Sequence, residues 1–405
     1  MPSTRSRLVS LGVALALVAA AFVASWGLVS ALDLPTGPDD YNLARWEVRY
    51  FPSKWLFQVG SLFRSRPNGS GEKNRVVERY LTLNAEIAKL EDEGAPPASR
   101  GLDEKRRERQ SLENTVEWIL EGRVTAVAEQ LGLEISWPLL PIRWVFPPVD
   151  FEFAEPPHVL AISPRDRVEL ESSTLLRSDL TPEETAALEA RREAQGVSAL
   201  VVGVGGVGTY PAAVPPSSDY ARTLETVAHE WLHHYFFFKP LGQRYFSSTT
   251  LKTLNETVAD IAGREMGQLV AERFPLSRGF AIPPSPRPTP DQAVDFNAVM
   301  RQLRRDVDRL LGEGQVDEAE ALMESRRRFL VEHGFRIRRI NQAYFAFHGL
   351  YADTPASISP IGPKLQELRR RLPSLSEFIR VAAQLTSEQD LDRLLTYPAN
   401  GYRTD

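Results

Sequence analysis

An uncharged run of 25 residues near the N-terminus, 8–32, constrains this chain more than any other feature. As a helix rising about 1.5 Å per residue it would span roughly 37 Å, enough to cross the hydrocarbon core of a bilayer. The apolar part of a cleaved signal peptide is usually only about 7–15 residues long, so the length favours an uncleaved anchor, although small residues at 19–24 also admit cleavage.

The charges that flank this run predict its orientation. Arg5 and Arg7 precede it, and aspartates follow it at 33, 39 and 40. The positive-inside rule then places residues 1–7 in the cytoplasm as a short tail and the rest of the chain outside. We therefore expect a single-pass protein of the cell membrane, attached through residues 8–32, with an extracytoplasmic body.

The composition narrows the chemistry of that body. The 405 residues include no cysteine, which excludes disulfides, cysteine zinc sites and thiol nucleophiles. Any metal ion must then be held by His, Asp or Glu, and three of the six histidines fall within positions 229–234. A formal net charge of −5 gives no electrostatic reason to expect a nucleic-acid partner.

Apolar periodicity predicts an α+β fold that is predominantly helical. Residues 33–136 form a helical membrane-proximal region, in which the aromatic-rich segment 41–63 lies at the membrane surface or packs on the body. Helices at 73–93 and 103–131 are expected to form an antiparallel hairpin. Short aromatic and β-branched runs between 137 and 163 predict a small twisted sheet.

Later elements follow the same logic. A helix at 182–195 begins with a capping box made by Thr181 and Glu184, and a glycine-rich strand is expected at 198–210. A proline-rich loop at 275–290 precedes a C-terminal helical lobe over 291–405. The many arginines of that lobe alternate with acidic residues, so we expect an ion-paired helical face rather than a site for polyanions.

A first motif lies at His229, Glu230 and His233, which form an HExxH pattern. On a helix the two histidines share one face and can bind one ion, and Glu230 can contact water bound to that ion. Leu and aromatic residues at helical spacing support this helix, with Asp219 as its cap. His234 points to another side and is expected to pack or to face solvent. Histidines that only hydrogen-bond within a core would give the same pattern.

A second motif supplies a candidate for the third ligand of the metal site. Asn255 and Glu256 begin an NExxxD pattern that ends at Asp260, and Asn255 follows His233 by 22 positions. A catalytic zinc takes three protein ligands and keeps one position open, and two His with one Glu is a known set. Glu256 can supply the third ligand, and Asp260, one turn later, can orient a ligating imidazole.

The two motifs together resemble the gluzincins, which include thermolysin-like and aminopeptidase-like zinc metallopeptidases. The segment also looks like the predicted membrane-associated aminopeptidases of bacteria. The resemblance covers 201–266 and implies Glu256 as third ligand, with Asn255 and Asp260 as the residues around the ligands. It further implies a small sheet beside a helical catalytic lobe, with the metallopeptidase core at 137–274. The GxMEN exopeptidase motif of one aminopeptidase family is absent, so the choice between exo- and endopeptidase stays open.

Glycines that precede the first motif indicate a possible binding role for the strand expected at 198–210. Gly203, Gly205 and Gly208 satisfy the dinucleotide pattern GxGxxG, but the prolines at 211, 215 and 216 leave no room for the helix that this fold requires. An edge strand that passes the metal, and that contacts substrate through Gly206, Gly208 and Tyr210, suits the glycines better. A merely flexible strand end is the alternative.

The expected reaction is hydrolysis of a peptide bond at one zinc ion, with Glu230 as general base. An oxyanion donor is sought in the helix expected at 340–351, where Asn341, Tyr344, His348 and Tyr351 share one stripe. We expect Tyr344 or His348 to be that donor, although half-buried packing explains the stripe as well. The substrate is a peptide or protein. The alternatives are a non-enzymatic helical membrane protein and a zinc hydrolase with a non-peptide substrate.

Overall fold

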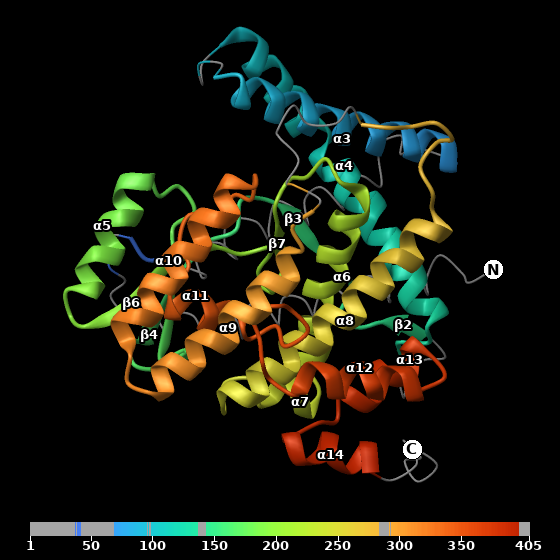
Figure 1. Cartoon of the computed structure of the whole chain (residues 1–405). Helices are drawn as coiled ribbons and strands as arrows, with labels where there is room; N and C mark the ends of the chain where they lie inside the picture. Colours follow the sequence, from blue (N-terminus) through green and yellow to red (C-terminus); the bar gives the residue numbers. More distant parts are fainter. Residues whose placement is uncertain are drawn as a thin grey trace.

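The computed structural model describes residues 37, 39–41, 69–94, 96, 99–136, 143–282, 291 and 293–396. Over these residues the fold is α+β and mostly helical, with three small sheets (Figure 1). The predicted anchor at 8–32 and almost all of the segment 41–63 lie outside the described residues. Within the described part of the chain, no helix is both long and apolar enough to cross a membrane.

The predicted helical hairpin is confirmed as α3 (Ser70–Asp92) and α4 (Arg100–Gln130). Gly94, with a φ of 77°, follows the end of α3 and supplies the left-handed conformation that turns the chain. The hairpin stands at the top of Figure 1, and α4 continues down to the centre of the molecule. There α4 packs against α8 (Thr249–Arg273), so the hairpin shares a core with the helices of the candidate site.

Three separate sheets replace the single sheet that the sequence suggested. β1 (Glu134–Ser136) pairs antiparallel with β2 (Arg143–Val145), and β3 (Phe151–Phe153) pairs parallel with β7 (Ala212–Val214). The third sheet has the antiparallel order β5-β4-β6, from Ser172–Leu176, His158–Pro164 and Val197–Gly203. β6 is therefore an edge strand of this sheet.

Both faces of the three-stranded sheet are covered by a helix. Side chains alternate along a strand, so Val159 and Ala161 face α11 (Gln342–His348), whereas Leu160 faces α5 (Pro182–Glu193). The predicted capping box of α5 is confirmed: the Thr181 hydroxyl accepts from the Glu184 amide (3.2 Å), and the Glu184 carboxylate accepts from the Thr181 amide (2.8 Å).

The predicted strand at 198–210 is wrong beyond Gly203, where β6 ends. Four of the six residues 203–208 are glycines, which have no side chain to pack against a neighbouring strand. The chain continues as a loop that forms one isolated bridge, Val207 with Ala213. This segment, 204–210, is called the glycine loop below.

At the centre of the fold, α6 (Tyr220–Phe237) and α8 lie side by side, joined by the short α7 (Pro240–Gln243) (Figure 1). The predicted Asp219 cap is confirmed, since its carboxylate accepts from the Arg222 amide (3.0 Å). Gly263 brings the two helices close: a Cβ there would stand 2.9 Å from the backbone of His229. Helices α12 (Ile361–Arg371), α13 (Leu375–Ala382) and α14 (Glu388–Thr396) cover α8 from the other side.

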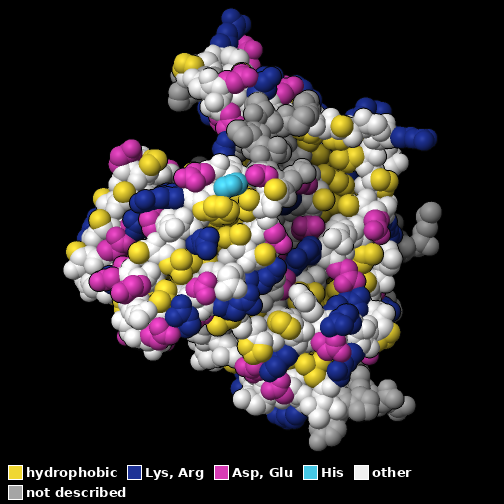
Figure 2. Space-filling view, in the orientation of Figure 1, with side chains coloured by type: hydrophobic (Ala, Val, Ile, Leu, Met, Phe, Trp, Pro, Cys, Tyr) yellow, Lys and Arg dark blue, Asp and Glu magenta, His cyan; other side chains and the backbone are white. Residues whose placement is uncertain are grey.

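Helices α9 (Phe296–Gly312) and α10 (Val316–Glu332) form a second hairpin with its own apolar cluster. The predicted ion pairing is present here: Arg304 binds Asp308 at 2.7 Å, and Arg327 binds Glu324 at 2.7 Å. Figure 2 shows basic and acidic side chains interspersed over this face of the molecule. The helix expected at 340–351 is shorter than predicted, because α11 ends at His348.

Candidate metal centre

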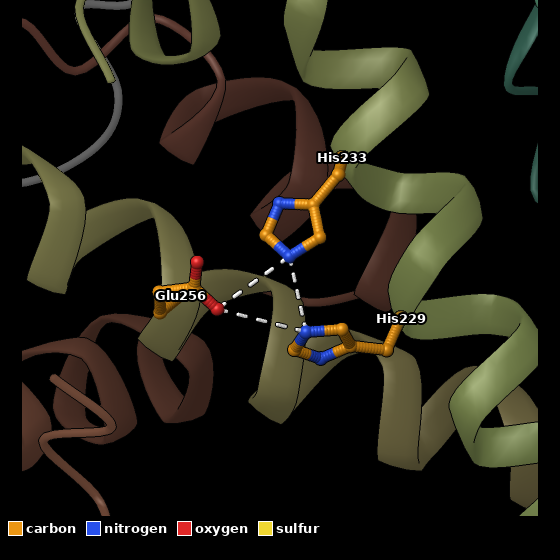
Figure 3. A group of neighbouring side chains, drawn as sticks. All are labelled: His229, His233 and Glu256. Carbon is orange, nitrogen blue, oxygen red and sulfur yellow. Dashed lines mark hydrogen bonds and ion pairs between the residues drawn. The ribbon is translucent and has the colours of Figure 1, made fainter. Parts of the chain in front are cut away.

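Three side chains from two helices converge at the centre of the fold. His229 and His233 lie one turn apart on α6, and Glu256 faces them from α8 (Figure 3). The two Nε2 atoms are 3.0 Å apart, and the Glu256 Oε2 lies 3.8 Å from that of His229 and 3.5 Å from that of His233. The predicted ligand residues are thus brought together, and the cluster could hold a metal ion.

The donor set fits a zinc ion in both size and chemistry. Zinc–nitrogen and zinc–oxygen bonds of about 2.0–2.2 Å in a tetrahedron set the donor atoms about 3.3–3.6 Å apart. The separations found here, 3.0, 3.5 and 3.8 Å, lie around that range. Two imidazoles and one carboxylate also leave a fourth position open, as catalytic zinc sites do. Glu256 is nearly fully buried; burial acts to raise the pKa of its carboxyl, but the two histidines hold that pKa well below the ordinary value. The Glu256 carboxylate is therefore ionised at neutral pH, as a metal ligand must be.

Glu230 lies beside the cluster under the glycine loop. It is buried, and burial raises the pKa of its carboxyl, against the opposing influence of His229 and His233. A Cβ on Gly206 would come within 2.3 Å of the Glu230 Oε1, and one on Gly208 within 3.6 Å of its Oε2. At Gly206 a Cβ would thus displace the carboxylate, and at Gly208 a Cβ would press on the Cβ of His233 at 3.2 Å, so the glycines let the loop lie this close to α6.

Asn255 orients one of the histidines. Its Oδ1 accepts a hydrogen bond from the His233 Nδ1 at 2.9 Å. That bond keeps the proton on Nδ1, so the Nε2 lone pair of the neutral imidazole points toward the cluster. Burial acts to lower the pKa of His233, but the Glu256 carboxylate more than offsets this and raises it to about 9. Without a metal ion the ring is therefore protonated at neutral pH, and a bound ion would displace the proton on Nε2.

Asp260 lies near His229 but has another hydrogen-bond partner. Its carboxylate accepts from Arg264 at 2.6 Å, and the same guanidinium nitrogen reaches Asp353 at 2.5 Å. Burial and the neighbouring Asp353 raise the pKa of Asp260 to about 6, and the charge of His229 acts in the opposite direction. His229 thus acts on the Asp260 carboxyl, and direct orientation of the His229 ring by Asp260 stays a prediction.

Two tyrosines contact the third ligand. The Tyr245 hydroxyl donates to the Glu256 Oε1, the oxygen turned away from the histidines. The Tyr351 ring lies 6.3 Å from that of His229, and its pKa is raised well above the ordinary value by burial and by the Glu256 carboxylate. Sequence reasoning missed Tyr245, because it lies in the connection before α8, outside any periodic pattern.

The stripe predicted for the oxyanion donor is divided by the structure. The Asn341 side chain caps α11, accepting from the Tyr344 amide at 2.9 Å and donating to the Ala199 carbonyl at 2.8 Å. Tyr344 and His348 pack on each other with ring centroids 4.4 Å apart, and burial lowers the pKa of His348 to about 4. Of the four residues of the stripe, Tyr351 is the one that the described contacts bring to the cluster.

His234, the neighbour of His233 in the sequence, holds the end of the glycine loop. The His234 Nε2 donates to the Thr209 carbonyl at 2.6 Å, and the Tyr210 ring packs edge-on against the His234 ring at 5.2 Å. Burial lowers the pKa of His234 to about 4, so it acts as a neutral donor. His234 is thus a packing residue that positions the loop, as the sequence favoured. Tyr210 also donates to the Pro148 carbonyl at 3.4 Å.

Comparisons with protein-family models, with curated proteins and with solved structures give no match. The function of this cluster is therefore inferred from its own residues.

Proposed function

We propose that this protein is a zinc-dependent peptidase that hydrolyses peptide bonds at the cluster of His229, His233 and Glu256. One observation carries the proposal: three donor atoms converge at zinc-like separations, and a second, buried carboxylate, that of Glu230, lies on α6 between the two histidines. A histidine pair that served packing alone would need neither the third ligand nor the second carboxylate.

Each residue has a distinct role in this proposal. A zinc ion held by the three ligands would polarise the scissile carbonyl and lower the pKa of a bound water. Glu230 would accept a proton from the attacking water and return it to the departing amine. Asn255 and Tyr245 would hold His233 and Glu256 in the orientation that binding requires, through the hydrogen bonds described above.

The sheet beside the cluster supports a peptide as the substrate class. β6 is an edge strand that leads directly into the glycine loop, and that loop contacts Glu230. The edge of β6 itself is bound at Val201 by the Glu189 and Arg338 side chains. An extended peptide would therefore pair through its main chain with the backbone of the glycine loop, next to the cluster. Gly206 and Gly208 would let the two backbones approach closely.

The location of the protein is proposed from the sequence. Residues 8–32 would anchor the chain, with residues 1–7 in the cytoplasm and the catalytic part outside.

The test compares Glu230→Gln with Glu225→Gln, the same change one turn before His229 on the same helix. Zinc content is measured by elemental analysis, and cleavage of a peptide library is read from new termini by mass spectrometry. We expect Glu230→Gln to keep its zinc and lose cleavage, and Glu225→Gln to keep both. Absence of zinc from the wild-type protein, or near-normal cleavage by Glu230→Gln, would refute the proposal.

A further inference from the structure

A group of exposed aromatic side chains lies at the C-terminal end of α6, next to the metal centre. Phe237, Phe238 and Phe246 are 68%, 50% and 93% exposed. Only two other large hydrophobic side chains, Val331 and Ile358, are comparably exposed among the described residues. Exposed rings gathered in one place are uncommon on a protein surface that faces only water.

Phe237 and Phe238 belong to a continuous row of aromatic contacts. Trp144 contacts Phe146 with centroids 5.5 Å apart, Phe146 contacts Phe238 at 5.0 Å, and Phe238 contacts Phe237 at 5.1 Å. The short α7 packs on the end of α6, where a Cβ on Gly242 would lie 2.7 Å from the Phe237 amide nitrogen. Phe246 follows α7 closely, at the same end of α6. We call Trp144, Phe146, Phe237, Phe238 and Phe246 the aromatic rim.

Basic residues outnumber acidic ones in the segments that form the aromatic rim. No Asp or Glu occurs between Glu230 and Glu256, whereas Lys239, Arg244 and Lys252 do. The segment 137–149 adds Arg143, whose charge is paired with Glu134 of the neighbouring strand β1 at 3.3 Å. Protein interfaces are enriched in aromatic residues and Arg but depleted of Lys, whereas an anionic lipid surface attracts both Lys and Arg.

We propose that the aromatic rim docks onto the surface of an anionic lipid bilayer. Aromatic rings are favoured at the level of the lipid headgroups, and neighbouring Lys and Arg side chains attract anionic lipids. The uncharged run 8–32 has the length and composition to keep the chain at a membrane. Such an anchor would hold the aromatic rim at a high local concentration near the lipid surface, so that even weak docking would be favoured. The inference does not depend on the reaction proposed above.

Docking would place the metal centre at the membrane surface. Phe237 follows His233 by one turn of α6. The Phe246 ring packs edge-on against Tyr245 at 4.8 Å, and Tyr245 binds the Glu256 carboxylate. A substrate would therefore reach the cluster along the bilayer.

The absence of cysteine allows a direct test with the full chain in lipid vesicles. Phe246→Cys and Phe238→Cys are each labelled with an environment-sensitive fluorophore, and Val331→Cys and Ile358→Cys are the matched controls, since their side chains are also apolar and exposed. The vesicles contain phosphatidylcholine and phosphatidylglycerol. Each label is exposed to a quencher attached to lipid chains, and separately to iodide in the water.

We expect labels at 246 and 238 to lose most of their emission to the lipid quencher and little to iodide, with the reverse at 331 and 358. Arg244→Glu, or vesicles of phosphatidylcholine alone, should weaken the lipid quenching at 246. Iodide quenching at all four sites alike would show that the rim faces water and would overturn the proposal. Protection of the rim labels from both quenchers would overturn it too, because protein would then cover the rim.

Discussion

The hydrogen bond from Tyr245 to Glu256 makes a quantitative prediction about metal affinity. The Tyr245 hydroxyl binds Oε1 of a carboxylate whose Oε2 faces both histidines. Tyr245→Phe removes this donor and leaves the buried Oε1 free to turn. Hydrogen bonds to charged groups contribute about 1.5–3 kcal/mol. At about 1.4 kcal/mol per factor of ten, the variant should bind zinc about 10- to 100-fold more weakly.

The assay is competition for zinc between the protein and a chromophoric chelator. Tyr344→Phe is the matched control: it also removes the hydroxyl of a half-buried tyrosine, but one whose ring packs on Phe345 and His348. Thermal unfolding of the metal-free proteins detects any general loss of stability. Equal zinc affinity of Tyr245→Phe and wild type would mean that this hydrogen bond does not orient Glu256.

Three further outcomes follow from the same geometry. Glu256→Ala removes one of three ligands and should lower zinc affinity strongly; equal zinc content in variant and wild type would contradict the assignment. Asp260→Ala should have a smaller effect and lower zinc affinity about 10- to 100-fold in the same titration, since this carboxylate does not bind the ion itself. Tyr351 is the residue of the stripe next to the cluster, and loss of an oxyanion donor typically lowers turnover about 100- to 1,000-fold. Tyr351→Phe should therefore cleave peptides more slowly by this factor while its zinc content stays unchanged. The same assay on Tyr344→Phe and His348→Ala decides whether either residue is the donor instead.

Local signals predicted the helices well. The Thr181 capping box and the Asp219 cap depend on side chains that satisfy amides within three residues, so the pattern along the chain contains the whole interaction. The pairing of His229 with His233 is equally local, because four residues make about one turn. For these elements the sequence alone was enough.

The sheets and the support of the site depend on contacts between distant segments. Phe151 and Phe153 donate their amides to Glu121 and Glu117 of α4, so a helix takes the place of the next strand beside β3. A sequence pattern predicts the strand, but it does not predict the carboxylates of α4 that bind the amides of β3 and so keep another strand from pairing there. Tyr245 was missed for the same reason, since its partner is set by the path of the chain through α7.

The distance between the two helices of the metal centre depends on a residue outside both motifs. Packed helices usually lie 8–10 Å apart, and the separation varies with the side chains at the contact. At Gly263 that side chain is absent, and the backbone of α8 there lies so close to α6 that a methyl group would stand 2.9 Å from the His229 nitrogen. Gly263 follows Glu256 by seven positions, or two turns, and so lies on the same side of α8. The residue that presents the third ligand and the residue that admits the neighbouring helix therefore share one face, and that face sets the separations on which zinc binding depends.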